Sequence, residues 1–321
     1  MIKIKDVFSV GETMIIFQAM QIGNFEDIPA LYQKIGGAES NVLIGLARLG
    51  HDVAYMSQVG RDPFGKRIIK SIRAEGVDVS NVKVSSDNPT GLLFKEQKTK
   101  EATHVYYYRK DSAASKMSVQ DLPVDVIRAS KFIHLTGITP AISLSCREMI
   151  FKIIEIAKEN QIPIIFDPNI RFKLWPKEEA KEVILDIAAH ADYILTGLSE
   201  AEFLVGTTNE SDICNLLTKN EGQVIVIKKG ASSTLFSING KLTEVPTVPV
   251  SGIVDPVGAG DAFAAGFIHG LLTNQSLERS VYFGNLLGAC VIQQFGDIEG
   301  LPNREEFEML CQSNEQVDIL R

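Results

Sequence analysis

Short β-branched runs alternate with amphipathic segments along most of the chain, and this alternation limits the possible folds more than any other feature. Buried strands are predicted at residues 7–10, 52–59, 131–135, 163–167, 192–195 and 224–227. Helical patterns are predicted at residues 39–49, 65–75, 145–160, 177–189, 210–219 and 262–272. Strands that alternate with helices connect through right-handed crossovers. The pattern therefore predicts an α/β fold in which helices cover both faces of a mostly parallel sheet.

Two regions interrupt this rhythm. Residues 90–97 and 102–109 are strand-like, and the polar turn 98–101 joins them without a helix, so we expect a hairpin. Residues 12–35 also contain strand-like pieces and no clear helix. Ligands of open α/β sheets bind beyond the carboxyl ends of the strands, where a flap acts as a lid. We expect a small β-sheet lid formed from roughly 12–36 and 88–112, within one domain spanning 1–321.

Composition excludes several classes of protein. The 321 residues carry a formal net charge of −8, which argues against a nucleic-acid partner or a polybasic membrane anchor. The apolar runs are strand-sized, and the first residues lack the apolar core of a signal peptide. The four cysteines lie far apart without a C-x-x-C pair, as is typical of buried thiols in a reducing compartment. We therefore expect a cytoplasmic protein that spans no membrane.

The segment Asp255–Phe263, with the sequence DPVGAGDAF, carries the strongest chemical signal. Small residues from Gly258 to Gly260 allow a ligand to approach the backbone, and the unpaired amides at the start of the next helix attract anions. Asp261 lies in the first turn, where its carboxylate can take a proton from a hydroxyl that attacks phosphorus. The alternative is an aspartate that only caps its helix.

Of two common nucleotide-binding motifs, the P-loop is incomplete and the dinucleotide-binding glycine motif is absent after the first strand. Residues 60–66 match G-x-x-x-x-G-K of a P-loop, but Arg67 stands where the Mg²⁺-binding hydroxyl is needed. No G-x-G-x-x-G follows the first strand, which disfavours a dinucleotide-dependent dehydrogenase.

Several spaced motifs resemble the ribokinase-like (PfkB) carbohydrate kinases over essentially the whole chain. Gly36 and Gly37 with Asn41 resemble the substrate-binding segment of that family, residues 60–65 its N-terminal signature, and 255–263 its C-terminal signature. The resemblance implies ATP and Mg²⁺ as cofactors, with a monovalent cation as a further candidate. It implies Asp261 as the catalytic base. The other implied catalytic residues, which form an anion hole, are Gly258, Ala259 and Gly260.

Within the family, the details resemble 2-keto-3-deoxygluconate kinases. The markers are residues 106–109, 112–114, 167–171 and 296–297. Because this substrate carries a carboxylate, Arg109 is expected to bind it bidentately, and Tyr107 to hydrogen-bond and stack. The alternatives are cross-strand packing for the tyrosines and a solvated charge for an arginine. The implied sugar-binding residues are Gly36, Gly37, Asn41, Tyr107, Arg109, Arg171, Asp261 and Asp297.

The resemblance also implies a nucleotide site and a metal-associated carboxylate. Residues 229–233 follow the 224–227 strand and resemble a nucleotide-binding turn, with a simple loop as the alternative. The implied ATP-binding residues are Asn169, Arg171, Lys229, Gly230, Ser232, Ser233, Gly258, Ala259 and Gly260. Glu200 is the implied Mg²⁺-associated residue, although Gly197 replaces the asparagine of the usual Asn-x-x-Glu. Leu93 stands where related kinases often have tyrosine, which removes one hydrogen bond.

The expected activity is ATP-dependent phosphorylation of 2-keto-3-deoxygluconate at its terminal O6. A fructokinase or ribokinase-type kinase of a neutral sugar remains an alternative, as does a non-catalytic sugar-binding regulator. Expected partners are a sugar or sugar acid and ATP, with no nucleic acid and no membrane. Lids of this family often pair between subunits, so we expect a homo-oligomer, with Leu92 and Phe94 providing an apolar edge.

Overall fold

A computed structural model describes residues 3–99 and 103–319. The end of the expected hairpin turn, residues 100–101, and the first residue of its second strand, residue 102, lie outside the described residues. Elsewhere the expected strands and helices are present, with bounds that differ by a few residues.

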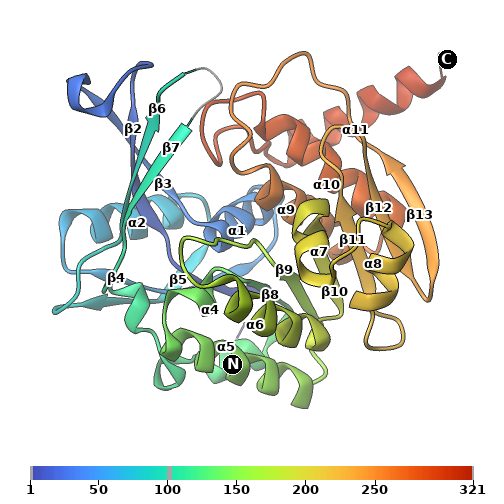
Figure 1. Cartoon of the computed structure of the whole chain (residues 1–321), viewed down its shortest axis with the longest axis horizontal. Coiled ribbons are helices and arrows are strands. Elements are labelled where there is room, and N and C mark those ends of the chain that lie inside the picture. The colour runs from blue at the N-terminus through green and yellow to red at the C-terminus, as the bar shows by residue number, and fades with distance from the viewer. Residues whose placement is uncertain (1–2, 100–102, 320–321) are drawn as a thin grey trace.

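The body of the protein is a large sheet in the order β13-β12-β11-β10-β9-β8-β1-β4-β5 (Figure 1). Its strands are β1 (Lys5–Val10), β4 (Val53–Gly60), β5 (Asp78–Ser85), β8 (Ser130–Thr136), β9 (Ile164–Asp167), β10 (Tyr193–Gly197), β11 (Val224–Lys228), β12 (Ser233–Ile238) and β13 (Lys241–Pro246). All neighbours from β5 to β11 pair in parallel, and β12 and β13 add an antiparallel hairpin at one edge. The predicted parallel α/β architecture is confirmed.

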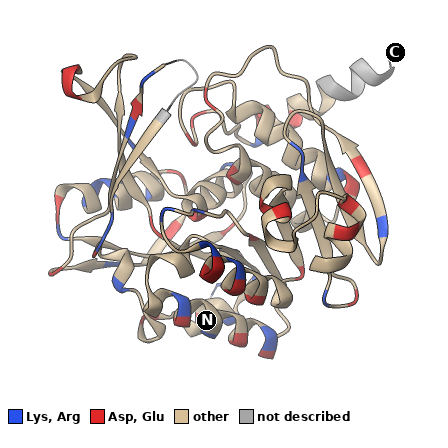
Figure 2. Ribbon diagram, viewed as in Figure 1, with Lys and Arg blue, Asp and Glu red and all other residues tan. Residues whose placement is uncertain are grey.

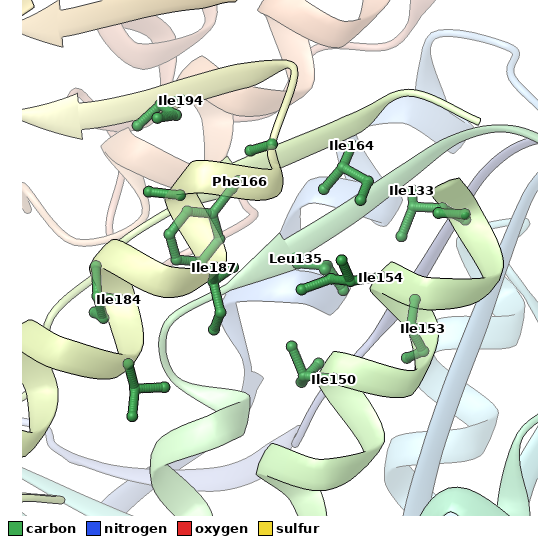
Figure 3. Packing of buried hydrophobic residues seen from close by; sticks show 14 of the residues in the cluster. Ile133, Leu135, Ile150, Ile153, Ile154, Ile164, Phe166, Ile184, Ile187 and Ile194 are labelled. Atoms are coloured by element: carbon green, nitrogen blue, oxygen red, sulfur yellow. The ribbon is translucent and has the colours of Figure 1, made fainter. Parts of the chain in front are cut away.

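Helices cover both faces of this sheet because successive strand residues point to opposite sides. On one side the core contains Phe8 of β1 and residues of α3 (Val124–Arg128), α5 (Leu144–Glu159), α6 (Lys177–His190), α7 (Leu198–Val205) and α8 (Glu210–Leu217). Figure 3 shows part of this core, where isoleucines of α5 and α6 face Leu135 and Phe166 of the sheet. On the other side the core contains Val7 of β1 and residues of α1 (Ala38–Arg48), α2 (Pro63–Ala74), α9 (Ala259–Leu272), α10 (Leu277–Val291) and α11 (Arg304–Ile319).

A second sheet rises from one side of the body (Figure 1, upper left). Its strands run in the order β3-β2-β6-β7 and are β2 (Met14–Ala19), β3 (Leu31–Gly36), β6 (Leu92–Gln97) and β7 (Thr103–Tyr108). β6 and β7 pair antiparallel with Leu93 opposite Tyr107, as the hairpin prediction requires. The expected apolar edge at Leu92 and Phe94 is wrong, because β6 lies between β2 and β7. Phe94 instead stacks on Phe17 across the sheet, with ring centroids 5.0 Å apart.

Short elements complete the chain: α4 (Thr139–Ile142) and 3₁₀ turns at Phe25–Asp27, Ala114–Lys116 and Val119–Asp121. Within the described ranges, no helix combines the length and the apolar character that crossing a bilayer requires. Figure 2 shows Lys and Arg interspersed with Asp and Glu along the outer helices. Cys146 and Cys214 are buried as expected, whereas Cys290 and Cys311 are only partly buried.

Candidate active site

A cavity of about 860 Å³ lies between the lid and the carboxyl ends of the parallel strands. Ligands of open α/β sheets bind at this position. Most of the residues singled out from the sequence line it, although they come from segments far apart in the chain. These are Gly36, Gly37, Asn41, Tyr107, Arg109, Asn169, Arg171, Glu200, Gly230, Gly258, Ala259, Gly260, Asp261 and Asp297.

Helix α9 begins at the wall of this cavity. Gly258 has a φ of 83°, and a Cβ there would lie 2.5 Å from the carbonyl oxygen of Asp297, so this position requires glycine. The amide of Ala262 donates to the carbonyl of Gly258 at 2.8 Å, which closes the first turn. The amides of residues 259–261 therefore precede the hydrogen-bonded part of the helix, where backbone N–H groups bind anions.

Asp261 lies in this first turn, and Nδ2 of Asn41 donates to its Oδ2 at 2.8 Å. Burial raises the pKa of Asp261 to about 7; the Asn41 hydrogen bond opposes the increase, and the charges of Asp297 and Asp167 add to it. A carboxyl group with a pKa near neutrality is suited to accept a proton from a sugar hydroxyl. Oδ1 of Asn41 is buried without a partner among the described residues, which leaves an acceptor for a ligand hydroxyl.

Polar contacts join the small sheet to the body near Asp255 and Phe295. Lys95 of β6 and Asp255, just before the start of α9, form a buried ion pair at 2.6 Å. Lys34 of β3 donates to the carbonyl of Phe295 at 2.6 Å. Strands β3 and β6 of the small sheet are therefore both joined to segments of the body, and β6 is joined to the loop that precedes α9.

Arg109 and Tyr107 present the lid's polar groups to the cavity. Nε of Arg109 donates to Glu12 at 2.6 Å, and Ser112 donates to the other oxygen of Glu12 at 2.6 Å. The guanidinium lies over the Tyr107 ring, 5.8 Å from its centroid. The expectation that Arg109 is free to bind a carboxylate bidentately needs correction, because Glu12 already occupies part of its fork. Arg171 is exposed and lines the cavity, so it is the better candidate to contribute uncompensated positive charge.

Glu200 closes the first turn of α7 and also fixes the loop after β9. Its Oε2 accepts the amide of Gly197 at 3.0 Å, and its Oε1 accepts the amide of Ile170 at 2.8 Å. No cluster of three or more His, Cys, Asp or Glu that could enclose a metal occurs in the described part of the chain. Mg²⁺ commonly uses one or two carboxylates together with waters and substrate phosphates, so the cavity-lining Glu200 fits a magnesium–nucleotide complex.

The chain is similar to known proteins over nearly its whole length. The profile of the pfkB family of carbohydrate kinases matches residues 4–314. The chain belongs to the PfkB family of carbohydrate kinases. It is an ATP-dependent sugar kinase.

Individual relatives give a finer picture. A 2-dehydro-3-deoxygluconokinase of Bacillus subtilis is 36% identical over 97% of this chain and 97% of its own length. Fructokinase-1 of rice (Oryza sativa subsp. japonica) is 31% identical over 96% of this chain and 98% of its own. An uncharacterized sugar kinase from Pyrococcus horikoshii, solved in complex with ATP, superposes with a TM-score of 0.82 at 28% identity, covering 94% of this chain and 96% of that one.

Three residues assigned to the nucleotide site do not line the cavity of this PfkB kinase. Lys229 instead pairs with Glu210 at 2.9 Å and with Glu244 at 2.7 Å, and Ser232 donates to the carbonyl of Lys229 at 2.9 Å. Ser233 donates to Glu244. The reason is strand alternation at the end of β11: Lys228 lines the cavity, and Lys229 points elsewhere.

The part of the cavity lined by the ends of β11 and β12 and by α10 contains residues that were not identified from the sequence. Val248, Val250, Ile253, Val257, Ala289 and Ile292 supply an apolar lining, and Thr234, Asn285 and Lys228 supply polar groups. Oγ1 of Thr234 donates to Asn285 at 2.7 Å, and Asn285 donates to the carbonyl of Pro246 at 3.0 Å. An apolar slot with a few fixed polar groups suits a nucleobase. Of these residues, only Lys228 could have been identified from the sequence. The alternation of side chains along β11 places it on the opposite side from the side chain of Lys229.

Proposed function

We propose that this PfkB kinase transfers the γ-phosphoryl group of ATP to the terminal O6 hydroxyl of 2-keto-3-deoxygluconate, also called 2-dehydro-3-deoxygluconate. The observation that carries the proposal is the position of Asp261, which combines a pKa near 7 with the amide-rich start of α9. The similarity to a 2-dehydro-3-deoxygluconokinase supports the choice of sugar.

The proposed reaction follows from the order of groups along the cavity. Asp261 takes the hydroxyl proton as the sugar oxygen attacks phosphorus, while the amides of residues 258–260 stabilise charge on the phosphoryl oxygens. Glu200 would help to hold Mg²⁺, which supplies charge neutralisation on the phosphates. The apolar side near Val250 and Ile292 holds the nucleobase.

The sugar end of the cavity is proposed to recognise an acid sugar. Tyr107 and Arg109 come from the lid, Arg171 from the loop after β9, and Gly36 from the end of β3. A Cβ at Gly36 would lie 2.8 Å from the Asp297 carboxylate, so glycine permits this carboxylate to lie against the backbone and face the sugar. The substrate carboxylate is assigned to Arg171 first, with Tyr107 and the part of Arg109 not engaged by Glu12 completing its site.

A coupled ADP-release assay across neutral and acid sugars tests the proposal. The expected result is a kcat/KM for 2-keto-3-deoxygluconate at least tenfold above those for fructose and ribose, with phosphorus NMR locating the new ester at O6. A preference for fructose would favour the second candidate, which the 31% identity to a fructokinase supports. Sugar binding without turnover of any panel member would indicate a non-catalytic regulator.

Charge at the sugar end is tested separately with Arg171→Met. Losing a charge-assisted contact of this kind costs roughly 1.5–3 kcal/mol, so KM for the acid sugar should rise by about 10- to 100-fold. KM for a neutral sugar should change less than threefold. Arg109→Met is the less clean variant, because it also leaves Glu12 buried without its cation. Equal effects of Arg171→Met on acid and neutral sugars would remove Arg171 from carboxylate binding.

Assembly, location and ion dependence complete the proposal. We propose a cytoplasmic homo-oligomer that pairs through the lid, whose outer face exposes Tyr106 and Tyr108. Light scattering after size-exclusion chromatography tests the oligomer, and Tyr108→Glu should weaken it. A monovalent cation remains a candidate cofactor, which rates measured in potassium, sodium and tetramethylammonium salts would decide.

A further inference from the structure

Lys228 is a cation beside the anion hole that the proposed mechanism has not yet used. It is the last residue of β11, it lines the cavity, and its side chain is 19% exposed. Its Nζ lies 3.7 Å from the position that a Cβ on Gly260 would occupy. The ammonium group is therefore next to the backbone amides that face the phosphoryl group.

Asp167 holds this ammonium in place. Nζ of Lys228 donates to Oδ2 of Asp167 at 2.9 Å, and the amide of Asn169 donates to Oδ1 of the same carboxylate at 3.0 Å. Asp167 ends β9 and Lys228 ends β11, with β10 between them. Lys228 therefore reaches Asp167 across β10, where Gly197 pairs in register with Lys228.

The local charge balance leaves Lys228 available to an anion. Burial alone would lower the pKa of Lys228, but the carboxylates of Asp167, Glu200 and Asp261 raise it, so the side chain stays protonated. A triphosphate entering this end of the cavity would meet those three carboxylates. A fixed ammonium among them lowers the repulsion and stabilises charge without having to reorganise.

We propose that Lys228 is a further catalytic residue, whose ammonium contacts an oxygen of the transferring phosphoryl group. In this step the sugar oxygen forms a bond to the γ-phosphorus, and the bond from that phosphorus to the β–γ bridging oxygen breaks. The bonding electron pair leaves with ADP, and the hydroxyl proton moves to Asp261. Lys228 remains protonated throughout and stabilises the negative charge on the phosphoryl oxygens, while Asp167 acts as its positioning residue.

The proposal is independent of the identity of the sugar, because Lys228 faces the phosphoryl group that every substrate of this kinase receives. The test therefore uses whichever sugar of the panel turns over fastest. If the enzyme prefers a sugar other than 2-keto-3-deoxygluconate, the role proposed for Lys228 is unaffected. If Lys228 proves not to be catalytic, the assignment of the sugar is unaffected.

The first comparison is Lys228→Met against Lys229→Met. Lys229 is the matched control, since it adjoins Lys228 in sequence and forms ion pairs with Glu210 and Glu244 outside the cavity. Lys228→Met is expected to lower kcat by about 10²-fold, the effect of removing one preorganised group that stabilises developing charge. KM for the sugar should stay within threefold. Lys229→Met should retain wild-type kcat, and equal kcat values for the two variants would overturn the proposal.

A double variant distinguishes two roles for Lys228: direct contact with the phosphoryl group, and neutralisation of the Asp167 charge alone. If Lys228 only balanced that buried carboxylate, Asp167→Asn together with Lys228→Met would restore both folding and turnover. The proposal expects the double variant to fold, by circular dichroism and thermal unfolding, and to remain about 10²-fold slow. Recovery of kcat to within threefold of wild type would overturn it.

Chemical rescue of kcat by an added amine gives a further test, because a purely structural role of Lys228 would not produce it. Lys228→Ala opens space for a small amine beside Asp167. Added methylammonium is expected to raise kcat of Lys228→Ala at least tenfold in a saturable manner and to leave Lys229→Ala unchanged. An equal response of both variants, or of neither, would count against direct contact between Lys228 and the phosphoryl group.

Discussion

Asp261→Asn should make this kinase slower and at the same time more stable, and the gain in stability should depend on pH. Burial first, and then the charges of Asp297 and Asp167, raise the pKa of Asp261 from 3.8 to about 7. The folded state therefore holds a proton that the unfolded state releases between pH 4 and 7, so the free energy of unfolding falls as pH rises through that window. The cost of ionising Asp261 is fully present above pH 7.

The size of the effect follows from the pKa difference. At 1.36 kcal/mol for each pH unit, the penalty at pH 8 is at most about 4 kcal/mol, and at pH 5.5 it is about 2 kcal/mol. The substituted asparagine keeps the shape of the aspartate side chain, and its amide oxygen can still accept from Asn41. Asp261→Asn should therefore stabilise the protein by about 2 kcal/mol more at pH 8 than at pH 5.5, while kcat falls at least about 10²-fold.

Urea unfolding followed by tryptophan fluorescence and circular dichroism at the two pH values measures the stability difference. Asp121→Asn provides a control, since hydrogen bonds from Lys83 and Ser118 outweigh burial and lower the pKa of Asp121. That variant should be less stable than wild type at pH 8. The wild-type kcat/KM should also rise about tenfold from pH 6 to pH 8 as Asp261 ionises. Equal stabilisation by Asp261→Asn at both pH values, or turnover near the wild-type rate, would refute this reasoning.

Two further changes probe the frame around Asp261. Gly258→Ala should lower the free energy of unfolding by about 1–2 kcal/mol from its left-handed backbone alone. It should also lower kcat, because the new Cβ would press on the Asp297 carbonyl. Gly206→Ala is the control for the backbone effect, because Gly206 also has a positive φ and has open space around it. Lys95→Met should destabilise by about 3–5 kcal/mol by leaving Asp255 buried and unpaired, and adding Asp255→Asn should recover most of the loss in urea unfolding. If the stability losses of Lys95→Met and Asp255→Asn simply added in the double variant, the two residues would not be coupled as an ion pair.

The sequence-based expectations failed where a pattern was weak or absent. Strand β5 was not predicted from the sequence. Only two of its eight residues are buried, so it lacks the apolar run of a central strand. The β12–β13 hairpin received no prediction, although its turn, Asn239-Gly240, has positive φ at both positions. Helix α10 also went unpredicted, yet it packs along α9 and helps to form the nucleotide side of the cavity.

The sequence by itself determined the alternating parallel architecture, the lid hairpin, and the chemistry of the segment Asp255–Phe263. Each of these depends on residues close together in the chain, whose spacing sets which face is buried and which groups meet at one turn. The tertiary structure decided which charges are available to a ligand. Glu12 engages Arg109 from 97 residues away, Lys228 rather than Lys229 reaches the cavity, and the pKa of Asp261 depends on distant carboxylates. The reason is physical: ion pairing and desolvation act through space, between segments that only the fold brings together.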